Sequence, residues 1–169
     1  SKHRVNPPCI YFGPCSGCQW QHIGYPQQLR LKRKIVEDEL LKYPMLSGMS
    51  VRNVIPDVNQ LGYRNHARFA VRYGGQIGFS NRMTRRFVRI DQCKLMDKKI
   101  NERLRKLQGL VSETSNLSVR VGVHTSDTLI QPKLANKKID VESGQKSYRE
   151  VLNGRVFKVA SPSFFQTNT

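Results

Sequence analysis

Three of the four cysteines of this 169-residue chain lie within ten positions near its N-terminus. Cys9, Cys15 and Cys18 have the spacing C-x5-C-x2-C, and Cys93 follows 75 residues later. The surrounding glycines and prolines permit tight turns but offer little apolar surface for a core. Four thiolates can form one closed site, and this spacing fits either zinc or an iron-sulfur cluster. Four cysteines are too few for a disulfide scaffold, and ordinary buried thiols are the remaining alternative.

Positive charge is the second strong feature of the chain. Lys and Arg number 29 against 12 Asp and Glu, which gives a formal net charge of +17. Residues 64–106 carry 13 basic and 3 acidic side chains and so supply +10 of this charge. An excess of this size indicates a polyanionic partner, with nucleic acid first and an anionic membrane surface second.

The sequence shows no segment that would insert into a membrane. It has no run of about 18 apolar residues, and residues 1–8, SKHRVNPP, lack the apolar stretch of a signal peptide. We therefore expect a soluble, cytoplasmic protein that does not bind membranes. We also expect it to be a monomer.

Apolar periodicity and turn residues predict an α+β fold with a mainly antiparallel sheet and two flanking helices. One helix is predicted from Tyr25 to residue 43, ending before Pro44, and a second from its N-cap Asp97 to Leu110. The second helix carries an apolar stripe of Ile100, Leu104, Leu107 and Val111. Strands are predicted at 51–55, 64–73, 76–80, 85–90, 117–123, 128–131 and 154–160, with turns at 74–75, 81–82, 143–144 and 153–154.

The segment from Arg64 to Tyr73 alternates strictly between two faces. Arginines at 64, 68 and 72 fall on one face, and apolar residues fall on the other, as in a half-buried strand. We expect the basic face to contact RNA phosphates, and a solvated strand face is the alternative. The candidate RNA contacts are Arg64, Arg68, Arg72, Arg85 and Arg86, and Arg82 and Arg89 are considered together with Arg85 and Arg86.

Four segments, in order along the chain, carry a family resemblance. They are residues 9–22, CIYFGPCSGCQWQH, residues 62–68, GYRNHAR, then Cys93, and residues 161–168, SPSFFQTN. They resemble the iron-sulfur signature, the Gly-Tyr-Arg-x-x-Ala-Arg strand, the fourth cluster ligand and the Phe-x-Gln-x-Asn motif of the RNA (uracil-5-)methyltransferase family. The similarity is to the cluster-bearing branch typified by the 23S ribosomal RNA enzymes. Where the family usually has Gly-Gly, this chain has Ser16-Gly17.

The resemblance implies two cofactors and a substrate class. A four-iron four-sulfur cluster, in place of zinc, would be held by Cys9, Cys15, Cys18 and Cys93. S-adenosylmethionine would be the methyl donor of the full enzyme, and the substrate would be RNA, ribosomal RNA before transfer RNA.

The last motif implies two contacts in the full enzyme. Phe164 would lie near a target base flipped out of its stack, and Gln166 would contact the methyl donor or the base.

The family's methyl-transfer machinery has no counterpart in these residues. The family uses a cysteine nucleophile, a glutamate base and a Rossmann-like domain for the methyl donor. Here all four cysteines match cluster positions, and no Gly-rich strand-to-helix fingerprint occurs. We interpret the chain as the central RNA-binding part of such an enzyme, inactive by itself, with the catalytic Rossmann-like domain of the same polypeptide absent. The alternative is a stand-alone, metal-stabilised RNA-binding module without catalysis.

This interpretation predicts four segments. Residues 1–25 would form the cluster loop, 26–44 a helix that packs on the absent catalytic domain, 45–160 the RNA-facing α+β domain, and 161–169 the entry motif of the methyltransferase domain. Because methyl transfer from a sulfonium needs no electron, we expect the cluster to be a structural clamp between the cysteine loop and Cys93.

Overall fold

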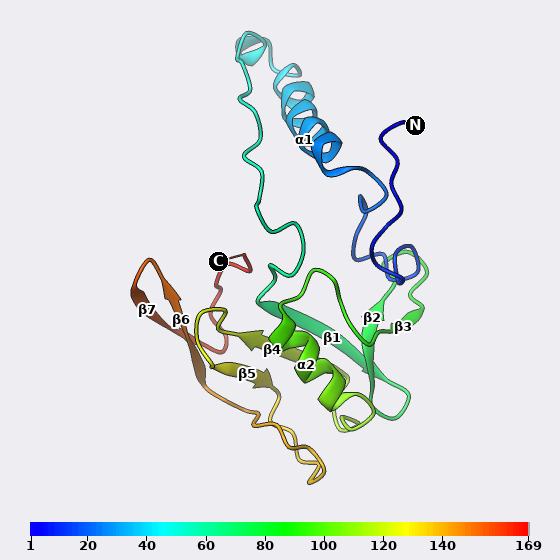
Figure 1. The fold of residues 1–169 in the computed structure, drawn as a ribbon, viewed down its shortest axis with the longest axis vertical. Coiled ribbons are helices and arrows are strands. Elements are labelled where there is room, and N and C mark those ends of the chain that lie inside the picture. Colours follow the sequence, from blue (N-terminus) through cyan, green and yellow to red (C-terminus); the bar gives the residue numbers. More distant parts are fainter. Residues whose placement is uncertain (169) are drawn as a thin grey trace. The chain divides into compact units, whose positions relative to one another are not determined.

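The computed structural model describes residues 1–168, which divide into two compact units (Figure 1). Unit 1 comprises residues 1–13 and 18–58, and unit 2 comprises residues 14–17 together with the chain from residue 59 onward. Within the described residues, no helix combines the length and the apolar character needed to cross a membrane.

Helix α1, Tyr25–Leu40, is the main element of unit 1. Gln28 Nε2 donates to the carbonyl oxygens of Trp20 and Ile23, at 3.1 and 2.8 Å, and so fastens the preceding loop to the first turn. The predicted helix end at residue 43 is wrong. Pro44 begins a short 3-10 helix, η1 (Pro44–Leu46), and the residue before this proline is extended, with φ −114° and ψ 107°, because proline disfavours a helical predecessor.

Residues 51–58 run back along α1 without forming the predicted strand at 51–55, so that prediction is wrong. Side chains hold this segment: Arg33 Nη1 donates to Asn53 Oδ1 at 2.7 Å, and the Asp57 amide donates to the Tyr25 hydroxyl at 2.8 Å. A strand needs a neighbouring backbone as its partner, and none pairs with this segment within residues 1–168.

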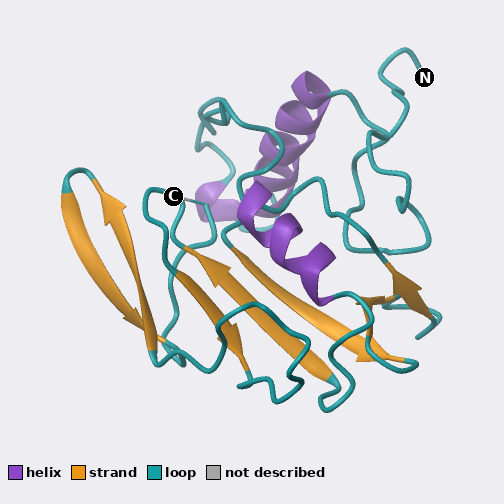
Figure 2. Ribbon diagram, turned by 60° about the horizontal axis from the view of Figure 1, so that its bottom comes forward, coloured by secondary structure: helices purple, strands orange, loops and turns teal. Residues whose placement is uncertain are grey.

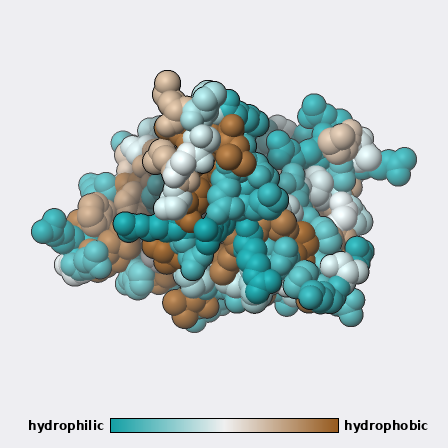
Figure 3. Space-filling view, turned by 90° about the horizontal axis from the view of Figure 1, so that it is seen from above, coloured by the Kyte–Doolittle hydropathy of each residue, from teal (hydrophilic) through white to brown (hydrophobic). Residues whose placement is uncertain are grey.

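No residue of α1 is buried, and its apolar Ile35 and Val36 are about half exposed, at 55% and 48%. Hydrophobic atoms accordingly lie among hydrophilic ones on the surface seen in Figure 3. That α1 packs on a catalytic domain remains a prediction.

Unit 2 contains a five-stranded sheet in which every neighbouring pair is antiparallel, which confirms the α+β prediction (Figure 2). Tyr73, Gly74 and Gly75 all have positive φ and form the predicted turn between the first two strands. The strand order is β3-β2-β1-β4-β5, with β1 His66–Arg72, β2 Gln76–Ser80, β3 Phe87–Arg89, β4 Asn116–Val121 and β5 Thr128–Gln131.

Helix α2, Lys98–Leu107, covers the apolar face of this sheet (Figure 2). The predicted N-cap is confirmed, because the Asp97 side chain accepts from the Lys99 amide at 2.7 Å. The predicted apolar stripe is confirmed for Ile100, Leu104 and Leu107, which are 0% exposed; Val111 is also 0% exposed but lies beyond the end of the helix. The inward side chains of β1, namely Ala67, Phe69 and Val71, are buried as well.

The predicted end of this helix at Leu110 is three residues too late. Gln108 leaves the helical conformation with ψ 121°, and its side chain bonds to the sheet instead. Its Oε1 accepts from the Ile77 amide at 2.6 Å, and its Nε2 donates to the Ile90 carbonyl at 2.8 Å. The side chain thus supplies the hydrogen bonds that the backbone lacks at the β2–β3 end of the sheet.

Strands β6, Ser147–Leu152, and β7, Arg155–Ala160, form a separate hairpin. Its turn is the predicted Asn153-Gly154, whose φ values are 49° and 74°. The sequence did not predict β6, since its inward face carries the charged Glu150 next to Tyr148 and so lacks a clean apolar alternation.

The loop after β4 is held by opposite charges on its two sides. The fully buried Glu150 carboxylate accepts from the amides of Val123 and His124, at 2.6 and 3.0 Å. The Lys99 ammonium donates to the carbonyls of Gly122 and Val123, at 2.6 and 3.0 Å. Charge-assisted hydrogen bonds of this kind are about twice as strong as neutral ones. They join α2, the sheet and the β6–β7 hairpin.

We expect Glu150→Ala to lower the free energy of unfolding by about 3 kcal/mol, because it removes a buried carboxylate and leaves the amides of Val123 and His124 without their acceptor. Urea denaturation followed by circular dichroism measures this change. Glu150→Gln keeps one acceptor oxygen and should cost less, and the exposed Glu142 provides the control substitution to alanine. A loss no greater than that of the control would contradict the role of this carboxylate.

Candidate functional site

The sheet face opposite α2 carries polar side chains from β1 and β4. The burial pattern of β1 alternates as predicted, and Arg68 and Arg72 point outward and are exposed. Across the strand pair, Arg68 lies opposite Ser118 and His66 opposite Arg120. We call the outward side chains of His66, Arg68, Arg72 and Ser118 the basic sheet face.

Arg68 borders a cavity of about 370 Å³ on this face. Asn116, Ser118 and Gln131 line the cavity as well, so a guanidinium group and several neutral hydrogen-bonding groups meet there. Within residues 1–168 the Arg68 side chain forms no hydrogen bond or ion pair, which leaves its donors available to a ligand.

The other predicted arginines of this region are placed differently. Arg64 lies before β1 in a parallel bridge with Met96, and its half-buried side chain has no hydrogen bond at the buried Nε. Arg72 Nη1 donates to two carbonyls of its own unit, and Arg89 pairs with Asp91 at 2.8 Å. The strand therefore brings Arg68 and Arg72 to one face and leaves Arg64 outside it.

His66 lies half-buried between two of these cations. Its Nε2 is 3.0 Å from the Ser118 hydroxyl oxygen. Burial, followed by the charges of Arg120 and Arg68, lowers the pKa of His66 to about 4. The imidazole is therefore neutral at pH 7 and adds a hydrogen-bonding group, but no charge, to the basic sheet face.

Arg85 and Arg86 lie in the turn between β2 and β3, residues 81–86, and both are exposed. Arg85 has a φ of 60°, which a strand does not permit, so the strand predicted at 85–90 begins only at Phe87. Phe87 contacts Tyr73 edge to face, with ring centroids 5.7 Å apart.

The C-terminal segment is fastened to the end of β1 by its backbone. The buried Asn65 donates from Nδ2 to the Gln166 carbonyl at 3.1 Å and from its amide to the Thr167 carbonyl at 3.0 Å. Arg120 Nη1 donates to the Ser163 carbonyl at 2.6 Å. Both Asn65 and Arg120 were missed by the sequence reasoning, although a polar residue on the apolar face of a strand, as Asn65 is, was the available signal.

The two neighbouring phenylalanines of this segment have opposite surroundings. Phe165 packs against Tyr148 and Phe157, with ring centroids 6.5 and 6.1 Å apart. Phe164 is 81% exposed, and the Gln166 side chain is exposed as well. Phe164 and Gln166 are therefore open to a ligand, whereas Phe165 belongs to the core.

The four cysteines are each partly buried, and none forms a disulfide. Cys9 and Cys18 belong to unit 1, whereas Cys15 and Cys93 belong to unit 2. The backbone of Cys93 is fixed by Asn101, which accepts from its amide at 2.8 Å and donates to its carbonyl at 3.1 Å. Across residues 1–168, no three His, Cys, Asp or Glu side chains converge in a way that could hold a metal ion.

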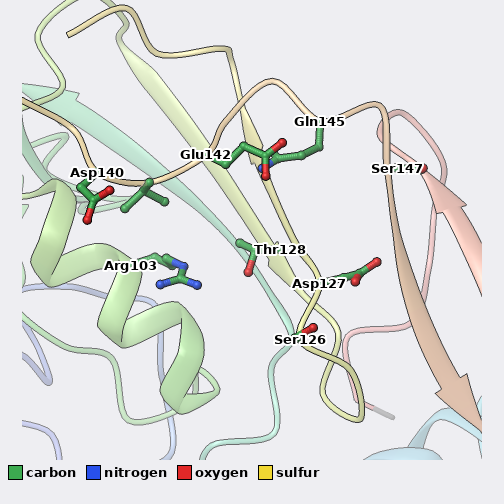
Figure 4. A pocket seen from close by; sticks show the side chains of 9 residues that line it. Arg103, Ser126, Asp127, Thr128, Asp140, Glu142, Gln145 and Ser147 are labelled. Carbon is green, nitrogen blue, oxygen red and sulfur yellow. The ribbon is translucent and has the colours of Figure 1, made fainter. Parts of the chain in front are cut away.

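A second cavity, of about 410 Å³, lies between α2, β5 and the loop before β6. Figure 4 shows Arg103 reaching toward Thr128 from α2, with Asp140 and Glu142 on the opposite loop. Asp127 at its margin is already bound by two guanidinium nitrogens of Arg149, both at 2.9 Å. The cavity mixes both signs of charge, so it does not extend the basic sheet face.

The lowered pKa of His66 predicts a pH dependence of stability. The folded state keeps this imidazole neutral down to about pH 4, whereas the unfolded chain protonates it near pH 6.5. The free energy of unfolding should therefore fall as the pH drops from 6.5 to 4, by the order of 1–2 kcal/mol from this residue, because solvent screening of the partly exposed ring reduces the full effect. His66→Gln should flatten the profile in that window, measured by urea denaturation at several pH values. A variant profile parallel to that of the unmodified chain would contradict the assignment, and His3→Gln is the control.

Comparison with known proteins places the chain among RNA methyltransferases. No protein-family model matches it. The 23S rRNA (uracil(1939)-C(5))-methyltransferase RlmD of Acidithiobacillus ferrooxidans is 33% identical over 119 residues, which cover 67% of this chain and 26% of that protein. An uncharacterized RNA methyltransferase of Aquifex aeolicus is 25% identical over 99% of this chain and 47% of that protein. The chain thus spans between about a quarter and half of the length of these relatives.

The fold has a solved counterpart. The crystal structure of the Pyrococcus abyssi tRNA (uracil-54, C5)-methyltransferase in complex with S-adenosyl-L-homocysteine matches 99% of this chain and 48% of that chain, with a TM-score of 0.70. At 22% identity this match concerns the fold alone. The sequence relatives confirm the family resemblance: the chain is a relative of the RNA uracil-C5-methyltransferases.

Proposed function

We propose that this chain is the RNA-binding part of an S-adenosylmethionine-dependent RNA uracil-5-methyltransferase, with ribosomal RNA as its substrate. The observation that carries the proposal is the basic sheet face, in a chain whose relatives include 23S ribosomal RNA uracil-C5-methyltransferases. A sheet face with exposed arginines offers fixed donors to phosphates while its strands keep those donors rigid.

The chemistry of this face suits single-stranded RNA. Arg68 can donate to a phosphate or to a base edge, and Ser118 and Gln131 can donate to or accept from groups that enter the same cavity. Unpaired bases expose these edges, whereas the deep major groove of an RNA helix hides them. The net charge of +17 adds a long-range attraction for any RNA strand.

The C-terminal motif supports a role near the target base. A base must leave its stack before its ring carbon can be methylated, and an exposed aromatic side chain such as Phe164 can hold it by stacking. Gln166 has an exposed side chain on a backbone fixed by Asn65, which suits a contact to the methyl donor or the base. We propose these two contacts for the full enzyme.

Methyl transfer itself is not assigned to these residues. The reaction needs a nucleophile that adds to carbon 6 of uracil, and each of the four cysteines matches a cluster position. We therefore propose that the 169 residues bind RNA and do not transfer a methyl group by themselves.

We further propose that Cys9, Cys15, Cys18 and Cys93 hold a four-iron four-sulfur cluster. Among residues 1–168 the four cysteines do not converge in this structure, so the proposal rests on the family resemblance and on the chemistry of the donor set: four thiolates are the ligands that such a cluster requires. Gly13 and Ser16 have positive φ and give the cysteine loop the tight turns that closely spaced ligands need. When bound, the cluster would supply metal–thiolate bonds that stabilise a loop with little core.

The RNA proposal predicts a salt-dependent affinity. Each neutralised phosphate contributes a slope of about −0.7 to −0.9 in log K against log salt concentration. Arg68→Gln together with Arg72→Gln should weaken binding of a uridine-containing RNA stem-loop and reduce the slope by about 1.4 to 1.8, measured by fluorescence anisotropy. Arg105→Gln on α2 is the matched control, since that arginine is exposed on the other side of the sheet. An affinity that does not change with salt would contradict the proposal.

The cluster proposal predicts a joint loss of iron and stability. Cys93→Ser should lower the iron content of anaerobically purified protein and its thermal midpoint together, because metal ligation contributes folding free energy. Absorbance spectra with iron and zinc quantification measure the first, and a circular dichroism melt measures the second. Loss of iron at an unchanged thermal midpoint would argue against a structural role of the cluster. Zinc in place of iron would contradict the assignment of the site to an iron-sulfur cluster.

A further inference from the structure

The turn between β2 and β3 is fixed internally by Asn81. The Asn81 side-chain oxygen accepts from the amides of Met83 and Thr84, both at 2.9 Å. The Asn81 backbone also bonds to both arginines at the far side of the turn, donating to the Arg86 carbonyl at 2.8 Å and accepting from the Arg85 amide at 2.9 Å. The turn therefore has one defined conformation.

The same turn is anchored to the segment that carries Cys15. Asn81 Nδ2 donates to the Pro14 carbonyl at 2.8 Å, and the Arg82 amide donates to the Ser16 hydroxyl at 2.8 Å. Ser16 has a φ of 53°, a conformation that favours glycine. Glycine at this position would have no side-chain acceptor for the Arg82 amide, so the Ser16 hydroxyl links the cysteine segment to the turn.

The anchored turn presents an apolar side chain among cations. Met83, at the tip of the turn, is 89% exposed, so it contributes little to the core. The side chains of Arg82, Arg85 and Arg86 are exposed around it, and their guanidinium groups form no ion pair within residues 1–168. Folding of unit 2 does not account for this arrangement, since none of the four side chains packs in it.

We propose that the turn 81–86 is a preorganised RNA-contacting tip in which Met83 inserts between two bases while its arginines bind the flanking phosphates. The proposal rests on the proposed function, because it names a further contact to the same RNA. Inserted apolar side chains, methionine among them, unstack neighbouring bases, and arginine phosphate contacts offset part of that cost. A turn that is already rigid loses little conformational entropy on binding.

The test uses an RNA stem-loop with 2-aminopurine at an unpaired loop position, whose fluorescence rises when the base unstacks. Binding of the unmodified chain should raise the fluorescence several-fold. Met83→Ala should lose most of this rise while the affinity changes less than about threefold. Met45→Ala is the matched control, because Met45 is 90% exposed in unit 1.

Two further variants test the supports of the tip. Arg85→Gln with Arg86→Gln should weaken binding at least tenfold and reduce its salt dependence. Ser16→Gly should keep the iron content and the thermal midpoint but lower the fluorescence rise, since the turn loses its anchor to the cysteine segment. A Ser16→Gly protein with the fluorescence response of the unmodified chain would overturn the positioning role of Ser16.

The outcomes separate this inference from the proposed function. If neither the unmodified chain nor any of its variants binds the RNA at low salt, the proposed function fails. If the RNA binds with the expected salt dependence but Met83→Ala keeps the full fluorescence rise, only the inserted methionine is overturned. Binding to phosphatidylserine vesicles that Met83→Ala abolishes, with an unchanged RNA response, would likewise overturn it and assign the tip to a membrane surface.

Discussion

The arrangement of unit 2 depends on the loop after β4, which is held between a cation and an anion. The Lys99 ammonium binds carbonyls of this loop, and the buried Glu150 carboxylate binds its amides. Lys99 belongs to α2 and Glu150 to β6, so the loop connects the helix, the central sheet and the β6–β7 hairpin. Gly122 has no room for a side chain there, since a Cβ would lie 2.4 Å from the Arg149 carbonyl oxygen.

The β6–β7 hairpin, held by this loop, in turn fixes part of the candidate site. The hairpin supplies Tyr148, against which Phe165 packs, and this contact fixes the C-terminal segment whose neighbour Phe164 remains exposed. The same segment is bound by Arg120, which also helps to keep His66 neutral. Arg68 thus stands on a rigid strand beside neutral hydrogen-bonding groups, an arrangement that can bind a phosphate or a base edge without reorganisation.

Much of this architecture follows from local sequence signals. Strict alternation identified β1 and its basic face, and Asp97 with its apolar stripe identified α2, because both patterns depend on neighbouring residues alone. The errors have long-range causes. β6 was missed because its inward Glu150 is compensated by amides 26 and 27 residues away. The extended segment at 51–55 resembles a strand locally but has side-chain partners on α1 in place of a sheet.

For the candidate site, too, the sequence predicted the residue types but not their long-range contacts. The sequence indicated candidate arginines for RNA contact, but it could not show that the strand separates Arg64 from Arg68 and Arg72, since bridge and strand differ only in their distant partners. It also could not show Ser16 bound to the turn after β2, because that contact joins residues 66 positions apart. Contacts of this length are set by the tertiary fold and leave no local pattern.

RNA is proposed to bind the basic sheet face and the turn 81–86 together. Arginine modification by phenylglyoxal, mapped by mass spectrometry with and without a uridine-containing RNA stem-loop, tests this proposal most directly. We expect RNA to protect Arg68 on the sheet and Arg85 and Arg86 in the turn, while Arg105 on α2 reacts equally in both samples. Equal protection of all exposed arginines, or protection confined to α2, would contradict it.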